Sequence, residues 1–169
     1  LGGARSGKSR LAQGLIERSE RRKVFIATAE SRDSEMSERI ALHQAERGAG
    51  WETREVPLDL PQAIRACTAD EAVVVDCLTL WLSNTMFAER SPSEVAADLV
   101  DSIRAAHCAL VLVSNEVGLG LVPETALGRA FRDEQGRLNQ RVAEVCDAAV
   151  AMISGCPLLL KPSPVADIA

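Results

Sequence analysis

The first nine residues contain the motif that most restricts how this chain can fold. The run Gly2-Gly3-Ala4-Arg5-Ser6-Gly7-Lys8-Ser9 fits the pattern G-x-x-x-x-G-K-[ST] at every fixed position. A helical pattern begins at once, with apolar residues at positions 11, 12, 15 and 16. Loops of this pattern join a buried strand to a helix, so the motif predicts an α/β sheet whose strands are connected by helices.

The motif also has a defined chemistry, which is phosphate binding. Glycines allow backbone N–H groups to close around phosphate oxygens, and the start of the helix adds a positive dipole. Lys8 is expected to reach the β- and γ-phosphates of a nucleotide as a catalytic residue, and Ser9 to ligate Mg²⁺. We predict nucleotide contacts along the whole run: Gly2, Gly3, Ala4, Arg5, Ser6, Gly7, Lys8 and Ser9. The alternative is a glycine-rich turn that only leads into a helix.

Four short apolar runs alternate with helical patterns along the chain. The runs lie at 24–28, 72–76, 109–114 and 148–153, and they are continuous rather than alternating, which is typical of parallel strands covered on both faces. Helices are expected at 8–21, 34–47, 60–67, 78–88, 93–107 and 124–146. This order predicts a doubly wound, mostly parallel sheet with helices on both faces. Residues 158–161 are expected to add a terminal strand through a hairpin.

The chain shows no internal repeat and no linker, and 169 residues suit a single domain. We therefore predict one nucleotide-binding catalytic domain over 1–161 and a C-terminal tail over 162–169. The sequence begins at Leu1 without a methionine. Because a phosphate-binding loop normally follows a strand, we expect residues upstream of Leu1 that belong to that strand.

Composition excludes several classes of protein. Apolar residues make up 47% of the chain and charged residues 25%, which rules out disorder for most of it. A net charge of −5 and an aromatic content of 3% disfavour nucleic-acid binding. No apolar run approaches the roughly 20 residues that span a bilayer, and no signal peptide is evident, so we expect a cytoplasmic protein without membrane insertion. Five scattered cysteines indicate neither a disulfide framework nor a zinc site.

A metal-binding carboxylate is expected at the end of the second apolar run. Val73-Val74-Val75-Asp76 places an aspartate at the carboxyl end of a buried strand. Enzymes with a phosphate-binding loop hold Mg²⁺ through such a carboxylate, so we predict that Asp76 and Ser9 are metal ligands. The same four residues also occur by chance in buried strands.

Only His43 and His107 can provide an imidazole. His107 is expected to end a helix just before a strand. Helical spacing places Arg39, His43 and Arg47 on one stripe, where two guanidinium groups would bind a triphosphate and keep the imidazole between them neutral. A neutral imidazole can attack phosphorus. From spacing alone, a solvated helix face is the stronger alternative.

Further blocks of sequence resemble one known family. They are Phe25-Ile26-Ala27-Thr28-Ala29, Glu35-Met36, Arg39-Ile40, His43, Trp51-Glu52-Thr53, Asp76-Cys77-Leu78-Thr79-Leu80-Trp81, Ser114-Asn115-Glu116-Val117-Gly118-Leu119-Gly120-Leu121-Val122-Pro123-Glu124, Phe131-Arg132-Asp133 and Gly136-Arg137-Leu138-Asn139-Gln140. Together with the phosphate-binding loop, these blocks closely resemble the bifunctional adenosylcobinamide kinase / adenosylcobinamide-phosphate guanylyltransferase family. The resemblance extends from Leu1 to about Lys161.

The resemblance implies two reactions of cobalamin biosynthesis. A nucleoside triphosphate, ATP or GTP, phosphorylates adenosylcobinamide, and GMP is then transferred from GTP to adenosylcobinamide phosphate to give adenosylcobinamide-GDP. It also implies a RecA-like fold and a homotrimer. His43 matches the family's guanylylated histidine. By the same match, we expect nucleotide contacts from Thr28, Ala29, Gln44, Ala45, Glu46, Arg47, Glu55 and Asp76.

Other interpretations stay open at this point. The segment 114–124 follows a strand at the edge where α/β sheets bind ligands, so Asn115 and Glu116 are candidate polar contacts or parts of an ordinary loop. Two alternative functions are a kinase with a phosphate-binding loop and no covalent intermediate, and a regulatory nucleotide-binding module that does not catalyse a reaction.

Overall fold

A computed structural model describes residues 1–30, 48 and 50–162. Its helices and strands, in chain order, are α1 (Lys8–Glu17), β1 (Arg22–Ala27), β2 (Trp51–Glu55), α3 (Leu60–Arg65), β3 (Glu71–Asp76), α4 (Leu78–Phe87), α5 (Pro92–Arg104), β4 (Ala109–Val113), α6 (Ala126–Val145), β5 (Ala149–Ile153) and β6 (Cys156–Lys161). The helix expected at 34–47 and the tail from 163 onward lie outside the described residues.

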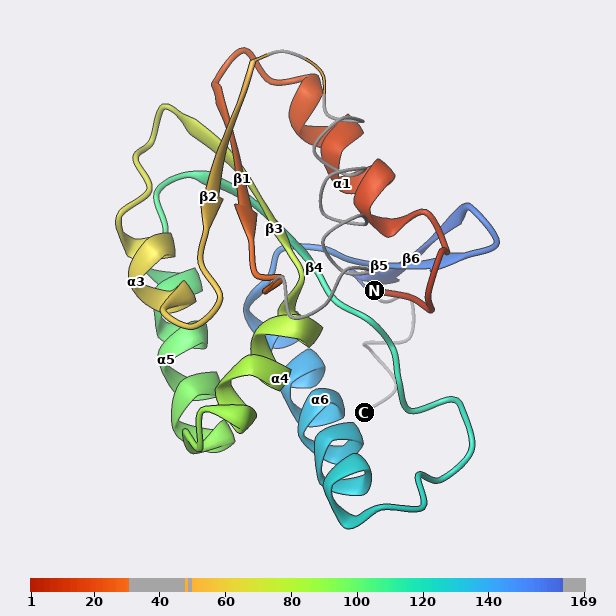
Figure 1. The fold of residues 1–169 in the computed structure, drawn as a ribbon. Coiled ribbons are helices and arrows are strands. Elements are labelled where there is room, and N and C mark those ends of the chain that lie inside the picture. The colour runs from red at the N-terminus through yellow and green to blue at the C-terminus, as the bar shows by residue number, and fades with distance from the viewer. Residues whose placement is uncertain (31–47, 49, 163–169) are drawn as a thin grey trace.

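A four-stranded parallel sheet forms the centre of the fold, in the order β2-β1-β3-β4 (Figure 1). The register pairs Ala27 with Asp76, and Asp76 with Val113. The carboxyl ends of β1, β3 and β4 therefore meet at one edge, which is the ligand-binding edge of α/β sheets. Crossover helices make this arrangement possible, because parallel neighbours cannot be joined by a tight turn.

Helices cover both faces of the sheet. Val24, Ile26, Val73 and Val75 pack on α3, α4, α5 and α6, whereas Phe25, Ala72 and Val74 pack on α1 (Figure 1). Successive residues of a strand point to opposite faces, so a strand buried on both sides needs a continuous apolar run. The predicted α/β fold with helices on both faces is confirmed.

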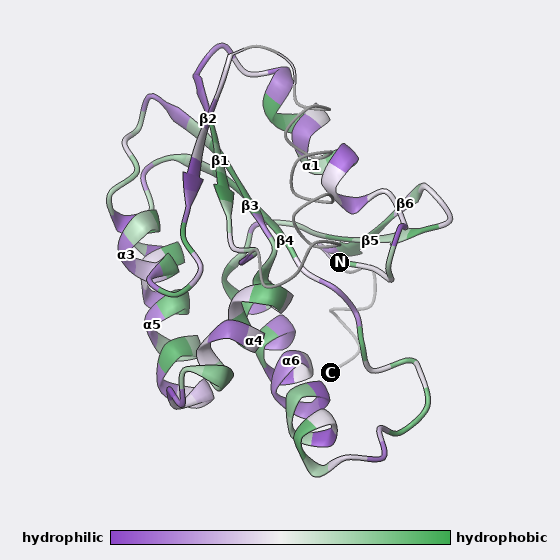
Figure 2. Ribbon diagram, viewed as in Figure 1, coloured by the Kyte–Doolittle hydropathy of each residue, from purple (hydrophilic) through white to green (hydrophobic). Residues whose placement is uncertain are grey.

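The strand β2 was not predicted from the sequence. Its residues Trp51-Glu52-Thr53-Arg54-Glu55 contain no apolar run, and Figure 2 shows a hydrophilic strand beside the hydrophobic β1. Among the described residues, β2 is an edge strand that pairs only with β1, and it leaves much of its surface in water. Arg54 extends from β2 to the buried carboxylate of Glu71, which also pairs with Arg22. Polar side chains suit this position because they discourage pairing with another chain.

The strand over 148–153 was expected to join the parallel sheet, and this expectation was wrong. β5 pairs antiparallel with β6 in a separate two-stranded sheet. The hairpin itself was predicted, although β6 begins at Cys156 rather than at 158. Toward the other side, Met152 of β5 makes an isolated parallel bridge with Gly2. Periodicity can identify a strand, but it carries no information about the neighbour with which the strand pairs.

Most predicted helices are present with shorter ends. α1 ends at Glu17 rather than at 21, and α5 at Arg104 rather than at 107. α6 begins at Ala126, where the hydroxyl of Thr125 accepts a hydrogen bond from the Gly128 N–H at 3.1 Å and caps the helix. Among the described residues, no helix combines the length and apolar character needed to cross a bilayer.

Candidate active site

The phosphate loop, residues Gly2–Ser9, lies at the carboxyl edge of the strands and leads directly into α1 (Figure 1). Its backbone conformation requires glycine at two positions. Gly2 has φ +147°, and a Cβ there would lie 2.5 Å from the carbonyl oxygen of Met152. Gly7 has φ +97° and forms the N-cap of α1. The fixed glycines of the motif therefore have a structural reason in this chain.

The loop has the features of an anion cradle. No side chain of the described residues caps the first turn of α1, so its N–H groups and dipole face the loop. The hydroxyl oxygen of Ser6 is buried and has no hydrogen-bond partner among the described residues. The Lys8 ammonium folds back and donates to the Gly3 carbonyl at 2.6 Å. A phosphate placed in the loop would give each of these donors an oxygen partner.

Electrostatics connect Lys8 with the end of β3. Partial burial lowers the pKa of Lys8, and the neighbouring Cys77 and Asp76 oppose that shift. Burial also raises the pKa of Cys77 to about 11, so its thiol stays protonated at neutral pH and is a poor nucleophile. Asp76 thus lies close enough to Lys8 to act on its pKa, and its role as a metal ligand stays a prediction.

Thr28 fixes the backbone beside Asp76. Its side chain is fully buried, and its hydroxyl donates to the Cys77 carbonyl at 2.7 Å and accepts from the Cys77 N–H at 2.8 Å. The Thr28 N–H donates to the carbonyl of Asp76 at 3.1 Å, and Asn84 donates to the carbonyl of Thr28 at 2.8 Å. These bonds give Thr28 a positioning role. Its expected contact with nucleotide stays a prediction.

The other predicted residues lie in three places. Ala29 follows β1 at the carboxyl edge, and Glu55 ends β2 at the same edge, where it is exposed. His43, Gln44, Ala45, Glu46 and Arg47 lie outside the described residues. His107 is exposed just before β4, at the amino edge of the sheet and away from Lys8. The structure therefore brings together the phosphate loop, Asp76 and the end of β1.

Four polar residues near this edge were not identified as functional from the sequence. Thr79 on α4 and Gln135 and Asn139 on α6 are buried, as is Asn84. Thr79 accepts a hydrogen bond from the N–H of Asn115 at 2.8 Å. No short motif marks such residues, because polar positions in a helix usually face solvent.

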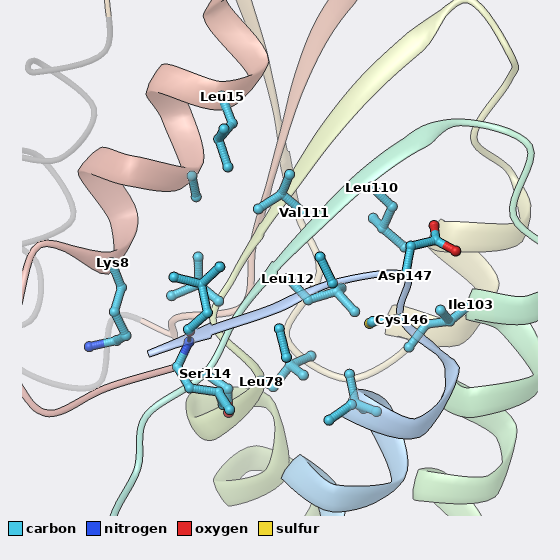
Figure 3. Close-up of a pocket in the computed structure, with 18 of the residues that line it drawn as sticks. Lys8, Leu15, Leu78, Ile103, Leu110, Val111, Leu112, Ser114, Cys146 and Asp147 are labelled. Carbon is cyan, nitrogen blue, oxygen red and sulfur yellow. Dashed lines mark hydrogen bonds between the residues drawn. The ribbon is translucent and has the colours of Figure 1, made fainter. Parts of the chain in front are cut away.

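A long apolar cavity of about 490 Å³ lies between β4 and β5 (Figure 3). Lys8 and Ser114 line one end, and Cys146 and Asp147 line the other. Leu1 also lines this cavity. Its amino group donates to the Val150 carbonyl at 2.8 Å, and its carbonyl accepts from the Met152 N–H at 2.7 Å, so Leu1 is bound to β5.

Comparison with known proteins places this chain in a family. The family model described as "Cobinamide kinase / cobinamide phosphate guanyltransferase" matches residues 1–160. The chain belongs to this family. The resemblance noted in the sequence is therefore confirmed, and members of the family are bifunctional enzymes, kinase and guanylyltransferase, of adenosylcobalamin biosynthesis.

Curated relatives match nearly the whole chain. The bifunctional adenosylcobalamin biosynthesis protein CobP of Pseudomonas aeruginosa is 43% identical over 168 residues, covering 97% of this chain and 96% of the relative. The bifunctional adenosylcobalamin biosynthesis proteins CobU of Salmonella typhimurium and Escherichia coli are 38% and 36% identical over 176 residues. Each of these two alignments covers 95% of this chain and 97% of the relative.

Proposed function

We propose that this chain catalyses both reactions of its family as one catalytic domain over 1–161. It phosphorylates adenosylcobinamide with ATP or GTP, and it then transfers GMP from GTP to adenosylcobinamide phosphate. The observation that carries the first reaction is the phosphate loop with Lys8 close to Asp76 at the carboxyl edge. A cytoplasmic location agrees with water-soluble nucleotide substrates.

In the phosphorylation step, the chain binds and orients the triphosphate. Backbone N–H groups of the loop and the start of α1 hold its oxygens, and Lys8 exchanges its bond to the Gly3 carbonyl for the β- and γ-phosphates. Most of the catalysis comes from this stabilisation of charge. The acceptor hydroxyl then attacks the γ-phosphorus, and the nucleoside diphosphate leaves.

The residues present fit a magnesium ion. Ser9 and Asp76 would hold Mg²⁺, which when bound neutralises charge on the β- and γ-phosphate oxygens. The part of the chain that the structure describes contains no group of three or more His, Cys, Asp or Glu side chains that could hold a metal ion. This donor set suits Mg²⁺, because Mg²⁺ usually takes one or two carboxylates and completes its shell with phosphates and water.

In the guanylyl transfer, His43 is the proposed nucleophile. A nitrogen of its imidazole bonds to the α-phosphorus of GTP, and pyrophosphate leaves with the electron pair of the broken bond. The phosphate of adenosylcobinamide phosphate then attacks the same phosphorus and releases the imidazole. The support for His43 is the match of the block around it to the family, together with the flanking Arg39 and Arg47. Nucleotide contacts from Gln44, Ala45, Glu46 and Glu55 belong to the same proposal.

We also propose that the chain assembles as a homotrimer. Support comes from the loop before α6, where Leu119, Leu121 and Val122 are exposed by 91%, 96% and 63%, and from Leu127 nearby, exposed by 57%. Contiguous apolar side chains in water mark interaction surfaces, and another subunit would cover them. Sedimentation equilibrium of the full chain measures the assembly directly.

A stepwise conversion assay tests the proposed function. The protein is incubated first with adenosylcobinamide, Mg²⁺ and ATP, and then with GTP. The corrinoid products are separated, and their masses are determined by mass spectrometry. We expect adenosylcobinamide phosphate first and adenosylcobinamide-GDP after GTP is added. Accumulation of the phosphate alone would instead support a kinase without a covalent step. If the corrinoid is unchanged while nucleotide binds, the chain is a binding module and the proposal fails.

A further inference from the structure

The turn that follows β4 lies between Asp76 and the phosphate loop. β4 is the neighbour of β3, and Val113 pairs with Asp76, so Asn115 comes two residues beyond the partner of the predicted metal ligand. On the other side, the N–H of Glu116 donates to the carbonyl of Gly2 at 3.1 Å. Ser114 and Lys8 line the same cavity (Figure 3). Asn115 therefore occupies the rim of the site in which a γ-phosphate would lie.

The main chain of Asn115 is fixed from two helices, but its side chain is not. Its N–H donates to the Thr79 hydroxyl on α4 at 2.8 Å, and its carbonyl accepts from the Asn139 side-chain amide on α6 at 3.1 Å. The Asn115 carboxamide itself is half-buried and makes no hydrogen bond with any residue that the structure describes. The rigidly held backbone fixes the place of the Asn115 side chain, and its unused amide can donate a hydrogen bond to a bound anion.

A buried polar cluster orients Asn139, and through it Asn115. The cluster consists of Ser114, directly after β4, and of Gln135 and Asn139 on α6, which are 3%, 0% and 7% exposed. The Asn139 side-chain oxygen accepts from Ser114 at 2.7 Å and from Gln135 at 2.9 Å. Because both donors hold the oxygen end of this amide, its NH₂ end faces the carbonyl of Asn115.

Stability alone does not explain this cluster. The side-chain oxygen of Gln135 is buried and has no hydrogen-bond partner among the described residues. A buried, unpaired acceptor is destabilising, and an apolar residue on the same helix face as Leu138 and Val142 would avoid that cost. Chains keep such locally unfavourable residues mainly at functional sites.

We propose that Asn115 is a catalytic residue of the phosphorylation step, and that Gln135 and Asn139 are positioning residues that act through it. This inference rests on the proposed kinase function. In that step the acceptor oxygen bonds to the γ-phosphorus and the bond to the β-phosphate oxygen breaks. The nucleoside diphosphate takes the electron pair, and the hydroxyl proton is lost to water. Asn115 keeps its protons throughout and donates a hydrogen bond to a γ-phosphoryl oxygen, where charge develops beside Lys8.

The first test compares Asn115→Ala, Asn115→Asp and the unchanged chain in the phosphorylation of adenosylcobinamide. We expect kcat to fall by about 100-fold in both variants, the size of effect seen when one preorganised donor to a developing anion is removed. KM for ATP is expected to stay within about threefold, because the phosphate loop still binds the nucleotide. A kcat of Asn115→Ala within about threefold of the unchanged chain would overturn the assignment.

The second test separates positioning from stability. Gln135→Leu removes the unpaired acceptor, so the urea midpoint is expected to stay equal or to rise, while kcat falls by about tenfold or more through misplacement of Asn115. A lower midpoint with unchanged kcat would show a purely structural role. Gln140→Leu, on the exposed side of the same helix, is the matched control and should change neither quantity. If the unchanged chain forms no adenosylcobinamide phosphate, the proposed function has failed rather than this inference.

Discussion

Replacing Thr28 by valine removes the hydroxyl that joins the ends of β1 and β3 while keeping the shape of the side chain. The hydroxyl bridges both backbone groups of Cys77. The Cys77 carbonyl would keep a partner, because it also accepts from the Trp81 N–H at 3.2 Å in α4. The Cys77 N–H would be left buried and unpaired. Thr28→Val therefore loses two hydrogen bonds, and the loss of the second leaves the buried Cys77 N–H unsatisfied.

These two losses set the expected magnitude. A lost hydrogen bond costs about 0.5–1.5 kcal/mol and an unsatisfied buried donor about 1–3 kcal/mol, so the free energy of unfolding should fall by about 1.5–4.5 kcal/mol. For a chain of this length, that corresponds to a decrease in Tm of roughly 3–18 °C. Urea denaturation followed by circular dichroism measures the change directly.

Thr85→Val is the matched control for this prediction. Thr85 is also fully buried, but among the residues that the structure describes its hydroxyl makes a single hydrogen bond, donated to the carbonyl of Leu82 at 2.8 Å within α4. Its loss leaves no buried N–H unpaired, so we expect a decrease of about 0.5–1.5 kcal/mol. Equal losses in the two variants, or a smaller loss in Thr28→Val, would refute the idea that Thr28 secures the backbone beside Asp76.

Three further predictions concern the site and the amino edge of the sheet. Lys8→Ala should lower kcat for cobinamide phosphorylation by about 100-fold or more, because it removes the lysine predicted to contact the transferred phosphoryl group; turnover equal to that of the unchanged chain would exclude the phosphate loop from catalysis. Asp76→Asn should shift the Mg²⁺ titration of activity to higher concentration with little change in the urea midpoint, and an unchanged titration would remove Asp76 from the metal site. Burial acts to raise the pKa of Glu71, but hydrogen bonds from Arg54 and the Thr68 N–H outweigh it and hold that pKa below its usual value of 4.5. The ionised carboxylate of Glu71 therefore stabilises the fold above pH 4.5, and this contribution is lost as pH falls through the lower, folded-state pKa. Glu71→Gln should flatten the dependence of the unfolding free energy on pH below about 4.5. An unchanged dependence in that pH range would contradict the argument.

The sequence was sufficient to predict a strand where its apolar pattern matches its burial in the fold. β1, β3 and β4 were predicted because a parallel strand covered on both faces must be apolar throughout. β2 was missed because an edge strand exposes polar side chains, and Trp51–Glu55 has the composition of a loop. The hairpin of β5 and β6 was predicted, but the separation of β5 from the parallel sheet could not be, since that separation depends on packing rather than on the pattern of β5 itself.

Some residues of the candidate site could likewise be predicted from the sequence, and others could not. The phosphate loop was recognisable because its chemistry requires particular residues at adjacent positions, and Asp76 followed from its place at the end of a strand. Thr79, Gln135 and Asn139 were not recognisable, because each resembles an ordinary polar residue of a helix. Only the packing of α4 and α6 against the end of β4 brings them to Asn115.

The most direct test of the two-reaction account is a labelling experiment with GTP that carries the label on its α-phosphate. If the imidazole of His43 attacks the α-phosphorus, GMP remains on the protein through a P–N bond, which is labile in acid and stable in alkali. The label should remain on the protein in denaturing electrophoresis. It should be absent in His43→Ala and retained in His107→Ala, whose exposed imidazole lies at the opposite edge of the sheet. Phosphorylation of adenosylcobinamide should persist at least in part in His43→Ala. An adduct that survives in His43→Ala, or one that is stable in acid, would contradict the account.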